Sequence, residues 1–129
     1  MAEAALHEPT RTRLDEEKIL SSAVARAADL WKLTNETLSQ ILGVSPATAS
    51  RLRSGAFRLE RGTKPFELGQ YVVRLFRSLD ALTGSDDAAS ISWLTTENLD
   101  LGGKPIERIR TVRGLGEVTD YLDAFRART

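Results

Sequence analysis

Residues 37–55 read TLSQILGVSPATASRLRSG, a pattern typical of two short helices joined by a tight turn. Gly43 is a natural residue to end the first helix, and Ser45 followed by Pro46 is a typical start for the second. Apolar side chains recur at helical spacing on one face of each helix. These candidate core positions are Leu38, Ile41, Leu42, Ala49 and Leu52. The combination predicts a helix-turn-helix, a motif that places its second helix in the major groove of DNA.

The second helix of this motif would present candidate DNA contacts on its outward face. Arg51 can make a bidentate contact to guanine, Ser50 can hydrogen-bond to several bases, and Ala47 can contact a thymine methyl group. Other residues in and after this helix are better placed for phosphates. They are Ser45, Thr48, Arg53, Arg58 and Arg61. Two short helices joined by a glycine turn also occur in bundles that bind no DNA, so a purely structural interpretation competes with this one.

The charged residues are distributed unevenly along the chain, although 18 basic and 18 acidic residues cancel overall. Residues 45–64 contain five basic residues against Glu60 alone, an excess of four positive charges. Residues 85–125 contain eight acidic and four basic residues, an excess of four negative charges. The basic region suits the phosphate backbone of DNA, whereas the acidic region suits a basic partner surface.

Apolar periodicity and helix caps predict an all-α fold, in which a helix-turn-helix N-terminal half packs with a small helical C-terminal half. Residues 1–13 lack a periodic apolar pattern and are expected to form a flexible arm. Residues 14–64 form the predicted DNA-binding region, residues 65–84 a central connecting helix, and residues 85–129 a second functional region. Helices are expected over residues 15–33, 36–42, 46–53, 65–82, 86–94, 106–110 and 112–126, with Ser85 capping the fifth.

Composition argues against several classes of function. The chain of 129 residues has no cysteine and a single histidine, His7. Disulfides, cysteine metal sites and a Ser-His-Asp triad are therefore excluded. No nucleophile lies beside a base and there is no phosphate-binding loop, so we expect no enzyme and no cofactor or metal. No apolar run is long enough to span a bilayer and the first residues lack a basic segment, so we expect a cytoplasmic protein without membrane contact.

A second pattern of large apolar, turn-forming and small residues lies in the C-terminal region. It consists of Trp93-Leu94, Asn98, Leu101-Gly-Gly-Lys-Pro105, Thr111 and Gly114, followed by an amphipathic final helix. This order resembles the toxin-binding domain of the Xre/MbcA/ParS-type antitoxins. Together with the helix-turn-helix, the resemblance covers about residues 15–127. The chain departs from the family's common aromatic-Gly ending, since it ends Phe125-Arg-Ala-Arg-Thr129.

The resemblance implies a type II antitoxin with two activities. Such a protein neutralises a RES-domain toxin, which degrades NAD or uses it for ADP-ribosylation, by blocking the active-site cleft of the toxin. It also binds operator DNA and represses its own operon. We expect a homodimer within a larger toxin–antitoxin complex, because one helix-turn-helix buries too little surface for specific DNA binding.

Candidate toxin-binding residues lie in the second pattern and in the final helix. They are Trp93, Asn98, Gly102, Gly103, Lys104, Glu117, Asp120, Tyr121 and Phe125. Trp93 can also be a core residue and Asn98 a turn residue. Glu117 and Asp120, together with Asp123, can form a solvated face. An alternative function is a free-standing helix-turn-helix transcriptional repressor without a toxin partner, whose acidic half only dimerises.

Overall fold

The computed structural model describes residues 2–128, with side chains from Arg11 to Ala127. Within that range the only strand-like pairing is an isolated antiparallel bridge between Asn98 and Gly103. None of the described helices has the length and apolarity needed to cross a bilayer. The predicted all-α fold is confirmed. Its helices are α1 (Ala2–Leu30), α2 (Asn35–Leu42), α3 (Pro46–Ser54), α4 (Lys64–Thr83), α5 (Asp87–Thr95), α6 (Pro105–Arg108) and α7 (Val112–Arg128).

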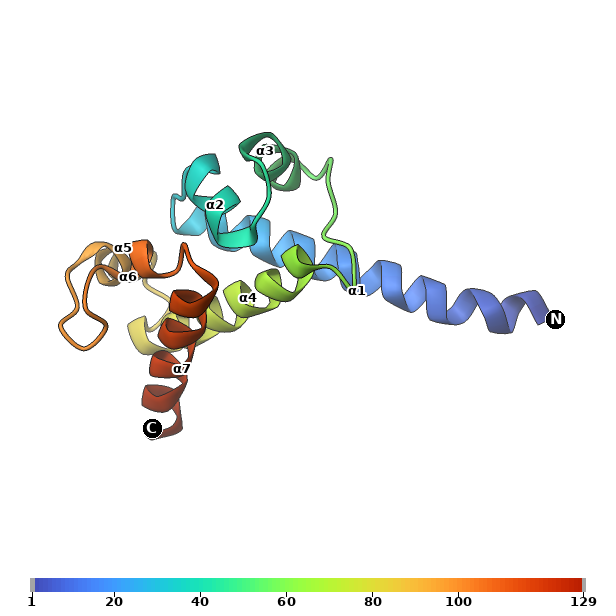
Figure 1. The fold of residues 1–129 in the computed structure, drawn as a ribbon. Coiled ribbons are helices and arrows are strands. Elements are labelled where there is room, and N and C mark those ends of the chain that lie inside the picture. The colour runs from blue at the N-terminus through green and yellow to red at the C-terminus, as the bar shows by residue number, and fades with distance from the viewer. Residues whose placement is uncertain (1, 129) are drawn as a thin grey trace.

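Helix α4 is the central element of the fold (Figure 1). It packs against α1 and α2 from the N-terminal half and against α5 and α7 from the C-terminal half. At Gly69 the approach is close, because an added Cβ would lie 2.9 Å from Leu59 Cδ1 and 3.3 Å from Val24 Cγ2. The buried residues of α4 are Phe66, Leu68, Gly69, Val72, Leu75, Ser78 and Leu79. The two halves of the chain therefore share one core across this helix.

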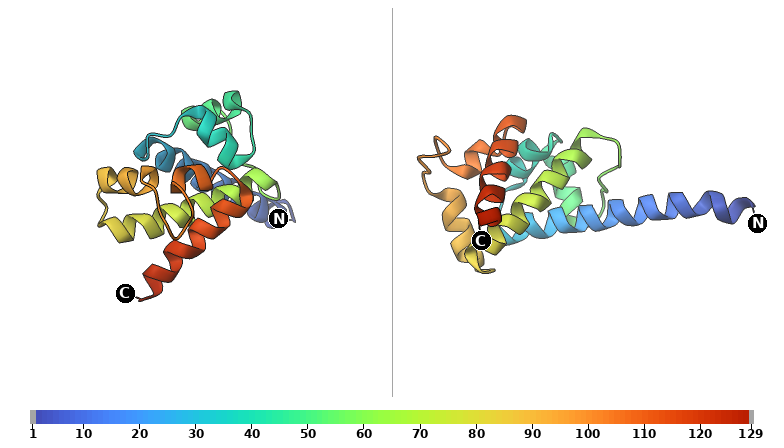
Figure 2. Two further views of the ribbon diagram at one scale, coloured as in Figure 1. Left: turned by 60° about the vertical axis from the view of Figure 1, so that its left-hand side comes forward. Right: turned by 90° about the horizontal axis from the view of Figure 1, so that it is seen from below.

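Helix α1 is longer than the sequence pattern predicts. The sequence predicts a flexible arm over residues 1–13, but α1 begins at Ala2 and extends well beyond the rest of the molecule (Figures 1 and 2). Residues 2–6 read Ala-Glu-Ala-Ala-Leu, and these strong helix formers favour a helix even without an amphipathic pattern. The helix also ends earlier than predicted, at Leu30, and Lys32 has a positive φ of 55° in the turn that follows.

Gly43 and Ser45 act at the ends of α2 and α3 as the sequence predicts, and Thr34 caps the start of α2. Thr34 Oγ1 accepts a hydrogen bond from the Thr37 amide at 3.0 Å, and Ser45 Oγ accepts one from the Thr48 amide at 3.1 Å. Gly43 ends α2 with a left-handed φ of 69°. These caps satisfy backbone groups that each short helix leaves without an intrahelical partner.

The predicted cap of α5 is wrong by one residue. Ser85 lies in the left-handed region with a φ of 63°, and its hydroxyl donates to Asp80 Oδ2 at 3.0 Å. An N-cap needs extended backbone, which Asp86 supplies with a φ of −90° and a ψ of 105°. Asp86 Oδ1 accepts a hydrogen bond from the Ala89 amide at 3.1 Å. The next helix, α6, starts one residue before its predicted start, at Pro105, because proline suits the first helical position.

Candidate functional site

Helices α2 and α3 form the helix-turn-helix that residues 37–55 predict. The five apolar residues assigned to its core are at most 2% exposed, as predicted: Leu38, Ile41, Leu42, Ala49 and Leu52. The predicted outward face of α3 is exposed and consists of Pro46, Ala47, Ser50 and Arg51. This face of α3 is therefore accessible, as a recognition helix requires.

Arg51 is held at this exposed face by a short chain of hydrogen bonds. Its Nη2 donates to Thr48 Oγ1 at 3.1 Å, and Ser45 Oγ donates to the same hydroxyl at 2.9 Å. Thr48 is half-buried, and its hydroxyl is the shared acceptor of both bonds. A guanidinium has five N–H donors, and this contact leaves donors for a nucleic acid.

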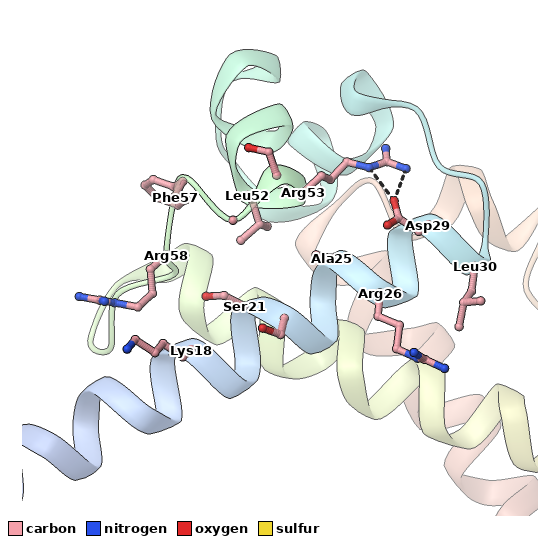
Figure 3. A pocket seen from close by; sticks show the side chains of 13 residues that line it. Lys18, Ser21, Ala25, Arg26, Asp29, Leu30, Leu52, Arg53, Phe57 and Arg58 are labelled. Atoms are coloured by element: carbon pink, nitrogen blue, oxygen red, sulfur yellow. Dashed lines mark hydrogen bonds and ion pairs between the residues drawn. The ribbon is translucent and has the colours of Figure 1, made fainter.

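The Arg53 guanidinium is occupied by contacts within the chain. Its Nε and Nη2 donate to Asp29 Oδ1 at 3.1 and 2.9 Å, as Figure 3 shows. Its Nη1 donates to Asn35 Oδ1 at 3.1 Å and to the carbonyl oxygen of Leu33. The sequence predicts a phosphate contact for Arg53, and in the structure its side chain joins α3 to the end of α1 and the start of α2.

The loop between α3 and α4 is fixed to α1 by a buried carboxylate. Glu17 is 2% exposed, and it accepts a hydrogen bond from the Arg61 amide at 2.6 Å and an ion pair from Arg58 Nε at 3.1 Å. The side chains of Arg58 and Arg61 remain 43% and 55% exposed, so both can still reach a phosphate. Sequence reasoning missed Glu17, because its partner Arg61 lies 44 residues away in the chain.

A groove runs between α1 and the residues at the end of α3 (Figure 3). Its basic lining residues are Lys18, Arg26, Arg53 and Arg58, and its one acidic lining residue, Asp29, is paired with Arg53. Lys18 and Arg58 lie at the same end of the groove in this view. The basic surface of the helix-turn-helix therefore continues onto α1, which sequence reasoning did not include in the site.

In the C-terminal half, residues 98–103 form a tight turn between α5 and α6. The backbones of Asn98 and Gly103 exchange two hydrogen bonds, at 3.0 and 3.2 Å. Asn98 Oδ1 also accepts from the amides two and three residues further on, at 3.0 and 3.2 Å. Gly102 has a left-handed φ of 72°, a conformation that favours glycine. The interpretation of Asn98 as a turn residue is confirmed, and the tip of the turn carries Leu99.

Three aromatic side chains, Trp93, Tyr121 and Phe125, form a row beside this turn. The ring centroids of Trp93 and Tyr121 are 6.5 Å apart and stacked, and those of Tyr121 and Phe125 are 4.9 Å apart and edge-to-face. The Tyr121 hydroxyl donates to Asp100 Oδ2 at 2.8 Å, which ties α7 to the turn. Trp93 packs against the core and is also partly exposed, so part of its ring surface stays accessible.

The aromatic row borders a cleft, which we call the aromatic cleft. It lies between the end of α4, α5 and the turn, with Tyr121 from α7. Its charged lining residues are Glu97 and Asp100, both acidic. Two apolar lining residues, Leu82 and Leu99, are among the exposed large apolar residues of the described chain. Neither was predicted as a site residue, because apolar periodicity alone assigns such residues to a core.

Two acidic residues on α7, Glu117 and Asp123, are paired with arginines of the same chain. Glu117 accepts hydrogen bonds from Arg108 and Arg113, and these hold the pKa of the Glu117 carboxyl below its usual range. Arg74 on α4 donates to Asp123 Oδ2 at 2.6 Å, and this hydrogen bond raises the pKa of Arg74. Glu117 and Asp123 therefore join α7 to its neighbours, although their side chains remain 40% and 29% exposed.

The two remaining predicted toxin-binding residues, Lys104 and Asp120, are exposed. Asp120 Oδ1 lies 3.6 Å from Arg74 Nη2. Among the described residues, no group of three acidic or histidine side chains could hold a metal ion. The candidate surfaces are therefore the exposed face of α3 with its basic surroundings and the aromatic cleft.

Two known domain families match the chain, one over each candidate surface. Residues 10–74 match the antitoxin Xre-like helix-turn-helix domain, and residues 78–128 match the antitoxin Xre/MbcA/ParS C-terminal toxin-binding domain. No curated protein sequence matches the chain. Domains of these two kinds are typically not enzymes. The first match contains α3 and the second contains the aromatic cleft, so the chain belongs to the Xre/MbcA/ParS-type antitoxins, which bind DNA and neutralise a toxin.

Proposed function

We propose that this antitoxin neutralises a RES-domain toxin that uses NAD, and that it represses its own operon by binding operator DNA as a homodimer. The observation that carries the choice of toxin is the aromatic cleft, an apolar surface whose charged lining is acidic. The exposed face of α3 supports the binding of operator DNA. The match of residues 78–128 to a toxin-binding domain favours this function over a free-standing repressor.

The chemistry of the aromatic cleft suits an enzyme site that holds a dinucleotide. Such a site must stabilise two phosphates, so it offers positive groups that an acidic antitoxin surface can occupy. Glu97 and Asp100 lie in the cleft, and the side chain of Asp120 on α7 is 75% exposed. Trp93 and Tyr121 are residue types that often dominate the binding energy of an interface. We therefore propose that these residues, with Phe125, contact the toxin, while Asn98, Gly102 and Gly103 shape the turn beside them.

On DNA, we propose that Ala47, Ser50 and Arg51 contact base edges and that Arg58 and Arg61 contact phosphates. A single short recognition helix reads few base pairs, so specific binding requires two copies of the chain about one helical turn of DNA apart.

Replacing Arg51 with alanine is expected to weaken operator binding by about 1–3 kcal/mol and to relax specificity at one base pair. The reason is that a bidentate contact to one guanine would be lost while the phosphate contacts remain. Titration of labelled operator and of single base-pair variants measures both effects. Arg77→Ala is the matched control, because Arg77 is an exposed arginine on α4 outside the helix-turn-helix. Equal operator affinity of the Arg51→Ala variant and the wild type would contradict the proposed role of α3.

Replacing Arg61 with alanine is expected to weaken binding to all DNA sequences alike and to lower the slope of log affinity against log salt by about 0.9. The loop should keep its conformation, because Glu17 binds the backbone amide of Arg61 and not its side chain. The side-chain pair with Glu16 is exposed and contributes little to stability. Affinities measured at several salt concentrations give the slope. An unchanged slope would show that Arg61 contacts no phosphate.

The proposed function is tested by co-expressing the chain with the product of the neighbouring reading frame. We expect a stable complex, loss of NAD consumption by that product, and repression of a reporter placed behind the promoter of the pair. The mass of the purified complex gives its stoichiometry. A neighbour without NAD-dependent activity, or a reporter that the chain leaves active, would contradict the corresponding part of the proposal.

A further inference from the structure

The tip of the turn over residues 98–103 presents a large apolar side chain to solvent. Leu99 is 94% exposed, more than any other exposed large apolar residue with a described side chain. Turn tips usually carry glycine, asparagine, aspartate, serine or proline, because these residues suit turn conformations or bond to the backbone. A leucine in this position stabilises neither the turn nor the core. It gains from burial only when another molecule covers it.

The contacts of the turn fix the backbone on both sides of Leu99. On its N-terminal side, the Asn98 side chain accepts hydrogen bonds from the amides of Asp100 and Leu101, at 3.0 and 3.2 Å. On its C-terminal side, the Asp100 carboxylate accepts the Tyr121 hydroxyl, and Leu101 packs against the core. A backbone that is already ordered loses less conformational entropy when its side chain binds a partner.

The surroundings of Leu99 indicate what would cover it. It lines the aromatic cleft with Leu82, Trp93 and Tyr121, and all four lie within residues 78–128, the matched toxin-binding domain. The charged lining residues, Glu97 and Asp100, flank Leu99 in the chain on either side. The complementary surface is therefore an apolar pocket with basic groups at its rim.

We infer that Leu99 is an anchor of the toxin interface, which inserts into an apolar pocket beside the NAD site of the toxin while Glu97 and Asp100 pair with basic groups at the rim. This inference rests on the proposed function, because the basic rim is the one expected of a dinucleotide site. It adds a residue and a recognition chemistry that the aromatic row alone does not give. Leu99 enters the pocket, and Trp93 and Tyr121 pack against its edge.

The test uses the full chain and the purified RES-domain toxin of the same operon. Leu99→Ser is expected to weaken toxin binding at least tenfold, about the effect of losing a central apolar anchor. Leu99→Asp should weaken it at least as much, because a charge cannot enter an apolar pocket without cost. Val112→Ser is the matched control, since Val112 is also exposed, at 70%, and lies in the same domain but outside the aromatic cleft. All three variants should keep wild-type affinity for operator DNA, which shows that they are folded.

The possible outcomes separate this inference from the proposed function. If the wild-type chain binds the toxin and both Leu99 variants bind equally well, Leu99 is not an anchor and the inference is overturned while the function stands. If Leu99→Asp binds more tightly than the wild type, the pocket is basic and not apolar, which also overturns the inference. If the wild-type chain does not bind the toxin, the proposed partner is wrong and the inference falls with it.

Discussion

Substitution of Gly114 by alanine is expected to lower the free energy of unfolding by about 3 kcal/mol or more, which corresponds to a fall in Tm of roughly 10 °C. Gly114 lies in the first turn of α7, where an added Cβ would be 1.8 Å from the carbonyl oxygen of Arg108 and 2.7 Å from its carbonyl carbon. Both atoms belong to the backbone, so no side-chain rotation relieves the clash. Either α6 or α7 must move, and the core that they cover must open. Thermal unfolding followed by circular dichroism measures the change.

Gly116 provides the matched control, because it lies two residues further along the same helix and a Cβ added there would meet nothing within 4 Å beyond the helix's own backbone. Gly116→Ala should therefore stabilise the protein, by about 0.5–1 kcal/mol, because alanine is the better helix former. A lower Tm for Gly114→Ala together with a higher Tm for Gly116→Ala would establish the close approach of α6 and α7. A Tm for Gly114→Ala at or above that of the wild type would show that the approach is not as close as described.

Replacing Trp93 with alanine is expected to weaken toxin binding about 30-fold or more, the effect typical of a dominant aromatic residue in an interface. The indole would be lost from the aromatic cleft, and Tyr121 would lose its stacking partner at 6.5 Å. Because Trp93 also packs on the core, its removal costs stability, so toxin affinity is compared at a temperature where operator binding remains that of the wild type.

Trp93→Phe keeps an aromatic ring in the row and should recover most of the affinity. Isothermal titration calorimetry with the toxin measures both variants. If Trp93→Ala binds the toxin as the wild type does, then Trp93 is a core residue alone and the interface lies elsewhere on residues 78–128.

Local sequence signals account for the parts of the fold that were predicted well. Thr34, Gly43 and Ser45 cap helices through hydrogen bonds to residues a few positions away, so their sequence context is enough to place α2 and α3. The outward set on α3 follows from the period of the helix once its buried face is known. The left-handed conformation of Ser85 has no comparable signal, which explains the misplaced cap of α5.

Long-range contacts account for what the sequence could not show about the site. Arg53 and Arg58 both look like free basic residues in the chain, and their partners on α1 become visible only when α3 and its loop pack against that helix. Glu117 is neutralised in the same way by Arg108 from the preceding helix. The exposure of Leu99 could not be predicted either, because an apolar residue in a turn gives no sign of whether it points into a core or into solvent.

The central position of α4 has a consequence for the turnover of the protein. The two matched regions end at residue 74 and begin at residue 78, both inside this helix, and helices from both halves pack on it. Neither half keeps a closed core without α4, so proteolytic cleavage within that helix should expose both halves to further digestion. A single cut would then release DNA and toxin together. Degradation of this antitoxin is therefore expected to be one event and not two, in which DNA binding and toxin neutralisation are lost at the same moment.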